Sequence, residues 1–259
     1  VKNERRQCYE NRPYGMAQLV LQPVVYPAPH PYSWPVIGSQ EHLDAASLDD
    51  VKDFFRRFYA PSNASLAIAG DIDPDDARRR VERYFEDLPP GPPISRIGRM
   101  SSDLSGHVSM TLQDKVQLPR LYLVWPTLPM FDADEAPLDV LASVLGDGKS
   151  SRLSRTLVFD KQVARDVRVG SWGQAITGEF EIVVTANPGV SLSELQDVVQ
   201  DELERIRTEP PAEQEVQRAK NRIQSDRVAH LERIGGFYGR ADLLNMYNLA
   251  AGDPGVINT

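Results

Sequence analysis

Apolar and polar positions follow a helical period in residues 47–58. Ser47 can cap a helix there, and Asp50 adds negative charge to its first turn. Pro61 ends the pattern, because a residue that precedes a proline is pushed out of helical dihedrals. One amphipathic helix with defined ends is therefore predicted. Its apolar face recurs at steps of three and four, through Leu48, Val51, Phe55 and Phe58.

A short apolar run lies at residues 66–69 and stops at Gly70. A continuous run of this length predicts a strand buried on both faces. Asp73 can then cap a second helix, because Pro74 suits the first helical position. The succession of helix, buried strand and helix predicts an α/β fold. The apolar stripe of the second helix is Ala77, Val81, Tyr84, Phe85 and Leu88.

The first 38 residues are less regular. Residues 1–10 are polar with helical character and suggest the end of a longer helix, whereas residues 16–21 could be helical or an apolar connection. Residues 23–35 hold five prolines, which exclude a regular helix or a central strand. Because aromatic residues lie among these prolines, we expect a loop held against the fold; they are Tyr26, Tyr32 and Trp34.

A change in composition marks a domain boundary. Residues 89–106 are rich in proline, glycine and serine, which is typical of a linker. The predicted domains are residues 1–93, as the C-terminal part of a first domain, and residues 107–259, as a second domain truncated at its end. Residues 94–106 are predicted to link them.

The second half alternates between strand and helix patterns. Strands are predicted at residues 107–112, 121–125, 163–172 and 177–186. Helices are predicted at residues 134–145, 150–160, 192–206, 212–233 and 237–250. A strand, a turn with proline, an amphipathic helix and a double proline occur in both halves of the chain. This shared layout favours a domain duplication, although an unrelated α/β binding module, which predicts no duplicated topology, stays an alternative.

Composition and charge narrow the function classes. The net charge of -8 disfavours binding to a phosphate backbone, so we expect no nucleic-acid partner. Cys8 is the single cysteine, which excludes a disulfide framework and a cysteine-based zinc site. No run approaches the length of a membrane span. Because the chain begins at Val1, we expect a piece of a longer polypeptide, and the sequence does not separate cytosol from periplasm.

No complete catalytic site is visible in the residues themselves. The four histidines, His30, His42, His107 and His230, lack the spacing of metal ligands. Residues 146–151 contain glycines, a lysine and serines but lack the spacing of a phosphate-binding loop. A glycine break followed by Ser150 as a helix cap explains them better.

Several motifs, taken in order and at their distances, resemble the insulinase/pitrilysin family of zinc metallopeptidases. In the first half they are HPYSWPVIGSQEHL, from His30, and FYAPSNASLAIAGDIDPDDARRRVERYFEDLP. In the second half the motif is VLGDGKSSRLSRTLVFDKQVA, which is similar to the family's L-G-x-G-x-x-S-R-L and its following helix. The resemblance covers nearly the whole chain.

The resemblance implies a fold and an activity for the longer protein. It implies an α/β fold, in the wider sense that includes α+β, with two homologous domains that each pack a mixed β-sheet against helices. Two such domains form one half of the enzyme, and two halves enclose a chamber in which peptides or unfolded polypeptides are cleaved. Zinc is held there by the two histidines of H-x-x-E-H and a glutamate, and it activates a water molecule.

Only one metal ligand is carried over to this chain. Val1-Lys2-Asn3-Glu4 matches the family's Val-x-x-Glu, so the resemblance implies that Glu4 is the third zinc ligand. A solvated carboxylate is the alternative. The H-x-x-E-H helix would lie before residue 1. We therefore expect zinc in the longer protein, no zinc bound to this chain alone, and no peptidase activity from it.

A second departure from the family pattern indicates which half of the enzyme the chain resembles. Active members carry an arginine and a tyrosine seven residues apart after Ser-Arg-Leu, and the matching positions are Val158 and Arg165. The chain therefore resembles the N-terminal, zinc-bearing half, whose partner would be the other half of the enzyme. A non-catalytic subunit or scaffold, such as a processing-peptidase partner, is the alternative.

Overall fold

The computed structural model describes residues 1–258 and divides into two compact units. Unit 1 comprises residues 1–43 and 98–223, and unit 2 comprises residues 44–97 together with those from 224 onward. Each unit is described by itself. Compact units and homologous domains are different divisions, so the predicted domain boundary in residues 94–106 stays a prediction.

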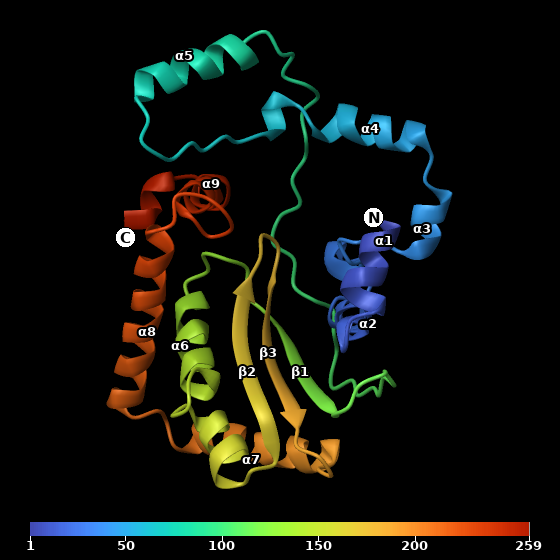
Figure 1. The fold of residues 1–259 in the computed structure, drawn as a ribbon, viewed down its shortest axis with the longest axis vertical. Coiled ribbons are helices and arrows are strands. Elements are labelled where there is room, and N and C mark those ends of the chain that lie inside the picture. The colour runs from blue at the N-terminus through green and yellow to red at the C-terminus, as the bar shows by residue number, and fades with distance from the viewer. Residues whose placement is uncertain (259) are drawn as a thin grey trace. The chain divides into compact units, whose positions relative to one another are not determined.

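Unit 1 contains a three-stranded antiparallel sheet (Figure 1). Its strands are β1 (Arg120–Thr127), β2 (Ala164–Gly173) and β3 (Gly178–Ala186), in the order β1-β3-β2. All three lie where the sequence predicts strands. The sheet is antiparallel throughout, so the mixed sheet implied by the resemblance is not found in the described residues.

One face of this sheet carries the core of the protein. The register places Leu123 and Val169 on either side of Ile182, on the same face of the sheet. Ile182, Val184 and Ala186 are fully buried, because α6 (Glu135–Gly146) and α7 (Leu192–Thr208) contribute to the same apolar cluster. The alternating burial of β3 follows from the period of two along a strand.

The contact between α6 and β2 is unusually close. Gly146 ends α6, and a methyl group at its Cα would overlap the side chain and backbone of Val169. The following turn, η4 (Ser154–Asp160), is π-helical and adds the buried Leu157 to the core. The predicted helix at residues 150–160 therefore forms with wider turns. α8 (Glu213–Leu231) begins in unit 1 and continues past its border.

The N-terminal residues of unit 1 are mostly helical. They form α1 (Lys2–Arg5), the π-helical η1 (Arg6–Glu10), α2 (Gly15–Val25) and η2 (Pro31–Ser33), and α3 (Gln40–Ala45) reaches the border of the unit. The predicted exclusion of helix from residue 23 onward is wrong by three residues. Pro23 lies in the last turn of α2, where it removes one i→i−4 hydrogen bond, and the helix ends two residues later.

Unit 2 consists of helices and extended segments in the described residues (Figure 1). Ser47 and Asp50 form a reciprocal capping box at the start of α4, as the sequence predicts. Asp73 likewise caps α5. The elements are α4 (Leu48–Phe58), η3 (Pro61–Asn63), α5 (Pro74–Phe85), α9 (Arg240–Ala250) and η5 (Pro254–Asn258).

Two predicted strands are wrong in the described chain. Residues 66–69 and 107–112 are extended, but they pair with no other strand among residues 1–258. Leu66 and Ile68 are 60% and 47% exposed, although the sequence predicts burial on both faces. The apolar pattern predicted a strand, but a buried strand also needs neighbouring strands and covering layers, and the described residues do not provide them.

Candidate functional site

The proposed zinc ligand Glu4 is an exposed side chain on α1. Its neighbour Arg5 fixes this short helix, because its guanidinium donates to the carbonyl of Gly38 at 2.7 Å and pairs with Glu10 at 3.2 Å. Successive helical residues point about 100° apart. Arg5 therefore anchors the helix while Glu4 stays free for a ligand from outside the described residues.

The described residues do not provide the rest of a zinc site. No group of three or more histidine, cysteine, aspartate or glutamate side chains comes together in residues 1–258 to hold a metal ion. A zinc site takes three protein ligands, so the donors present here do not fit the metal by themselves. Glu4 can be one ligand of a site whose other ligands come from elsewhere.

The four histidines have different surroundings. His30 is 3% exposed, accepts a hydrogen bond from the backbone N–H of Tyr32, and bonds through Nε2 to the carbonyl of Met100. His230 stacks on the ring of Tyr238. His42 and His107 are exposed. His30 thus serves the structure of its loop.

Val158 and Arg165 occupy the positions of the family's arginine and tyrosine, and neither contributes to a metal site with Glu4. Val158 is in η4 and packs against the apolar core. Arg165 is an exposed residue of β2. Neither side chain provides the phenol that the resemblance associates with substrate contact.

The Ser-Arg-Leu motif is a structural anchor. Ser151 donates from its hydroxyl to the carbonyl of Gly148 at 2.7 Å, and Leu153 is fully buried. Between them, Arg152 makes a bidentate pair with Glu215, at 2.9 and 3.0 Å. The motif therefore joins the start of η4 to the start of α8.

The Arg152–Glu215 pair is the strongest ionic contact that sequence reasoning missed. Arg152 holds the pKa of the Glu215 carboxyl well below its usual range, at about 2, and the backbone N–H of Ala212 adds a second hydrogen bond. Both side chains are mostly buried, at 10% and 22% exposure. Near it, Glu202 is 3% exposed and accepts from Thr156.

The proline-rich loop is held to the β2–β3 hairpin, as its aromatic residues predict. Tyr26 is fully buried and donates from its hydroxyl to the carbonyl of Gly178 at 2.8 Å. Tyr32 accepts at its hydroxyl from the N–H of Ile176. Trp34 is 61% exposed, so the prediction fails for this third aromatic residue.

Two carboxyl groups with raised pKa values lie on the polar face of the sheet. Burial raises the pKa of Glu179, which lies beside Tyr26. Burial also raises the pKa of Glu181, and the neighbouring Glu179 raises it further. Burial, with the adjacent Glu179, raises the pKa of the Tyr26 hydroxyl in turn. A raised pKa means that these groups keep their proton to a higher pH than usual, because burial favours the neutral form.

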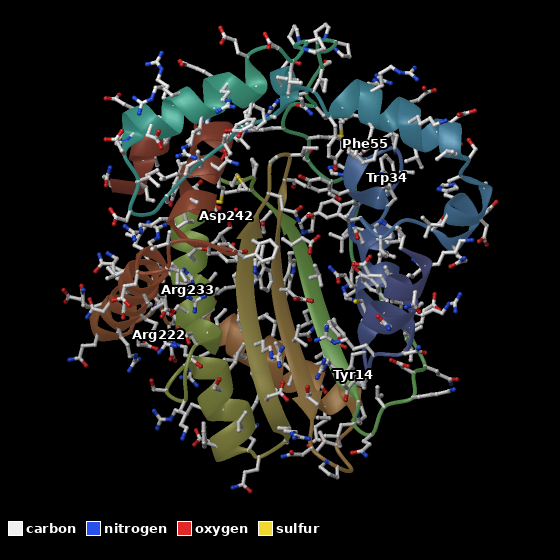
Figure 2. The ribbon with its side chains drawn as sticks, turned by 45° about the horizontal axis from the view of Figure 1, so that its top comes forward. Tyr14, Trp34, Phe55, Arg222, Arg233 and Asp242 are labelled. Atoms are coloured by element: carbon white, nitrogen blue, oxygen red, sulfur yellow. The ribbon has the colours of Figure 1, made fainter. Side chains whose placement is uncertain are left out.

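A second anchor holds the start of α2 to β1. The guanidinium of Arg120 lies 3.6 Å from the ring centre of Tyr14. Figure 2 labels Tyr14. The Tyr14 hydroxyl donates to the carbonyl of Leu118 at 2.8 Å. No signal in the sequence pointed to these partners.

Two hollows are present at the surface. One of about 490 Å³ in unit 1 lies at the start of α7 and includes Lys161 and Asp197, and one of about 450 Å³ in unit 2 lies between Ser65 and Asn245. Neither includes Glu4, Val158 or Arg165.

Comparison with known proteins gives a family match over most of the chain. Residues 45–223 match the family described as the peptidase M16 inactive domain. The zinc protease PqqE of Helicobacter pylori is 26% identical over 236 residues, which cover 90% of this chain and 53% of that protein. An uncharacterized zinc protease of Streptomyces coelicolor, SCO5738, is 27% identical over 80% of this chain and 46% of its own length. The chain thus spans about half the length of these relatives.

Solved structures share the fold. A protease from Helicobacter pylori superposes with a TM-score of 0.83 at 24% identity, covering 99% of this chain and 62% of that one. A peptidase M16 inactive domain from Pseudomonas fluorescens has a TM-score of 0.77 at 23% identity, covering 99% and 60%. A chain of complex III2 from Candida albicans has a TM-score of 0.69 at 15% identity, covering 94% and 58%.

None of the helices in residues 1–258 is both long and apolar enough to cross a lipid bilayer.

Proposed function

Because the chain belongs to the peptidase M16 inactive-domain family, we propose that it is a wall-forming part of a longer zinc metallopeptidase. The observation that carries this proposal is the family match over residues 45–223, together with relatives named zinc proteases. No group of side chains in residues 1–258 could hold a metal ion. In this proposal the chain therefore depends on the rest of the longer protein for peptide hydrolysis.

In this proposal the chain contains parts of two homologous domains. Residues 1–93 are the C-terminal part of the first, residues 94–106 are the linker, and residues 107–259 belong to the second. In the second domain, the sheet of β1, β2 and β3 packs with α6 and α7 around the buried apolar core.

The longer protein encloses peptides or unfolded polypeptides between this half and a second half. The substitution of Val158 and Arg165 for the family's arginine and tyrosine supports the assignment to the zinc-bearing half. The other half is then the source of the groups that contact the scissile peptide.

Glu4 is the residue of this chain that would bind the metal. When bound, zinc acts as a Lewis acid and lowers the pKa of a water molecule. The contribution of this chain is orientation: Arg5, held by Gly38 and Glu10, fixes α1 and with it the carboxylate of Glu4.

A metal measurement on the longer protein tests the ligand. We expect Glu4→Gln to lose most of the bound zinc and of the peptidase activity, because two histidines alone hold zinc weakly. Glu41→Gln is the matched control, since Glu41 is an exposed acid of another helix in the same unit. Full zinc content in Glu4→Gln, measured by elemental analysis, would show that Glu4 is not a ligand.

A non-catalytic subunit or scaffold is the second candidate. It is favoured by the occurrence of the same fold in a chain of complex III2. The sequence that precedes Val1 in the longer protein separates the two candidates, because an intact H-x-x-E-H supports the peptidase and a degraded one supports the scaffold.

A further inference from the structure

His30 lies at a junction of three segments of unit 1 that are far apart in the sequence. It belongs to the proline-rich loop, and its side chain is buried. Its Nε2 lies 3.3 Å from the carbonyl oxygen of Met100, in the segment that enters unit 1 at Gly98. The N–H of Met100 donates to the carbonyl of Ile176, in the turn of the β2–β3 hairpin, at 3.2 Å. The loop, the entering segment and the hairpin therefore meet here.

The contacts at this junction form a closed cycle. The N–H of Ile176 donates to the hydroxyl of Tyr32 at 3.2 Å, and the backbone N–H of Tyr32 donates to Nδ1 of His30 at 3.0 Å. The cycle returns through Nε2 of His30 to Met100. We call these four residues, His30, Tyr32, Met100 and Ile176, the His30 clasp. The imidazole is the only side chain that bonds to two of the three segments within it.

The hydrogen bonds determine the protonation state of the imidazole. Nδ1 accepts from the N–H of Tyr32, so this nitrogen carries a lone pair and no proton. Nε2 then carries the proton and donates to the carbonyl of Met100. The closed clasp therefore requires a neutral ring with its proton on Nε2.

A second proton on the ring is incompatible with the closed clasp. It would place an N–H on Nδ1 directly against the N–H of Tyr32, where two donors face each other without an acceptor. It would also place a positive charge in a buried position, which is costly when no carboxylate pairs with it. Opening of the clasp removes both costs, because the ring then reaches water.

The charged groups near the imidazole have other surroundings. The titratable groups of the elements packed around it are Tyr26, Tyr32, Arg99, Asp103 and Glu179. Both tyrosine hydroxyls are hydrogen-bonded to the hairpin. Asp103 is exposed, and Glu179 lies beside the hydroxyl of Tyr26. Arg99 pairs with Asp132, largely at the surface, where such pairs hold a segment weakly. In the part of the chain that the structure describes, none of these carboxylates bonds to the imidazole.

We propose that the His30 clasp is a proton-sensitive device that controls the length of the connection between the two units. The chain passes from unit 2 to unit 1 between Ile97 and Gly98, just before Met100. With a neutral ring the clasp holds Met100 and keeps this connection short. Protonation opens the clasp and releases residues 98–101, up to the next attachment, where the hydroxyl of Ser102 donates to the carbonyl of Val25. The device needs no metal and does not rest on the proposed function.

Amide hydrogen exchange of the 259-residue chain tests the proposal. It is measured one pH unit above and one below the ordinary histidine pKa of about 6.5, as protection factors, which removes the intrinsic pH dependence of exchange. The amides of Tyr32, Met100 and Ile176 are the reporters, because each donates within the clasp. Opening takes up a proton, so acid favours the open state, and we expect these protection factors to fall by about tenfold at the lower pH. Those of β3 should stay constant.

Two substitutions separate the contributions of the two ring nitrogens. His30→Gln keeps a neutral donor that reaches the place of Nε2, so the amide of Met100 should stay protected at both pH values. His30→Asn keeps an acceptor at the place of Nδ1, as in an Asx turn, but is too short to reach Met100, whose amide should exchange fast at both pH values. His42→Gln replaces an exposed histidine and is the control, which should respond to pH like the unsubstituted chain.

Equal protection of the reporter amides at the two pH values in the unsubstituted chain would overturn the proposal. So would a fall in His30→Gln as large as in the unsubstituted chain, or a parallel fall in β3, which would indicate general unfolding. If circular dichroism shows that His30→Gln does not fold, the NMR titration of the Hε1 proton of His30 in the unsubstituted chain decides. Its midpoint should coincide with the loss of protection at Met100, and a ring that stays neutral while this protection is lost would refute the device.

Discussion

Unit 1 and unit 2 are built from the same kind of elements and differ in whether those elements find partners. Both contain helices with serine caps and apolar stripes, such as α7 with Ser191 and α4 with Ser47. In unit 1 the stripe of α7 meets a sheet and is buried, whereas in unit 2 the stripe of α4 stays exposed. The comparison separates what local sequence specifies, which is the element, from what tertiary partners supply, which is its burial.

The largest difference is expected from the same substitution in the two units. Ile182→Ala removes a fully buried side chain from the core of unit 1 and should cost about 3 kcal/mol of unfolding free energy. Ile68→Ala removes a side chain that is 47% exposed and should cost less than about 0.5 kcal/mol in this chain. Urea denaturation followed by circular dichroism measures both, and equal losses would break the comparison.

The next effect concerns ion pairs. Glu215→Gln breaks the bidentate contact with Arg152 and should cost about 2 kcal/mol at neutral pH, because it leaves a mostly buried guanidinium with a weaker partner. The exposed pair of Asp76 and Arg80 in unit 2 is the control, and Asp76→Asn should leave the unfolding midpoint unchanged.

The same pair predicts a pH dependence. The folded-state pKa of Glu215 is lowered to about 2, so its stabilisation is present above the ordinary carboxyl pKa and is lost as pH falls toward 2. The Glu215→Gln variant should lack this part of the acid-induced loss. Denaturation midpoints measured from pH 7 downward would contradict it if both proteins lose stability in parallel.

The smallest effect separates local from global stability. Ser47 and Ser191 each accept a hydrogen bond from the third residue of their helix, both at 3.2 Å. Ser191→Ala should lower the unfolding free energy by about 1 kcal/mol, since α7 belongs to the core. Ser47→Ala should instead speed amide exchange in residues 48–58 and leave the main unfolding transition in place. A shift of that transition by Ser47→Ala as large as by Ser191→Ala would show that the two units unfold together.

The success of sequence reasoning follows the distance over which each feature is determined. The capping box of Ser47 and Asp50 is decided within one helical turn, so the sequence shows it. The strand predicted at residues 66–69 depends on neighbouring strands that are not found in residues 1–258, so its local pattern was insufficient.

In the candidate site, too, the sequence showed local features and missed the contacts between distant residues. Arg152 was noticed only as part of a motif, because its partner Glu215 lies 63 residues away and carries no local signal. The aromatic residues of the proline-rich loop predicted attachment but not the partner of Tyr26. Glu4 was reached through the family pattern alone, and the anchoring of its helix by Arg5 and Gly38 became visible only in three dimensions.

The hydrogen bond from Tyr26 to Gly178 has a consequence for the order of events on the ribosome. Its two residues are 152 positions apart, so the tyrosine leaves the exit tunnel long before its acceptor has been translated. At 5–20 residues per second, the delay is about 8–30 s. During this interval the proline-rich loop has no β2–β3 hairpin to pack against. The ring of Tyr26 therefore stays unpacked in the nascent chain until the hairpin emerges.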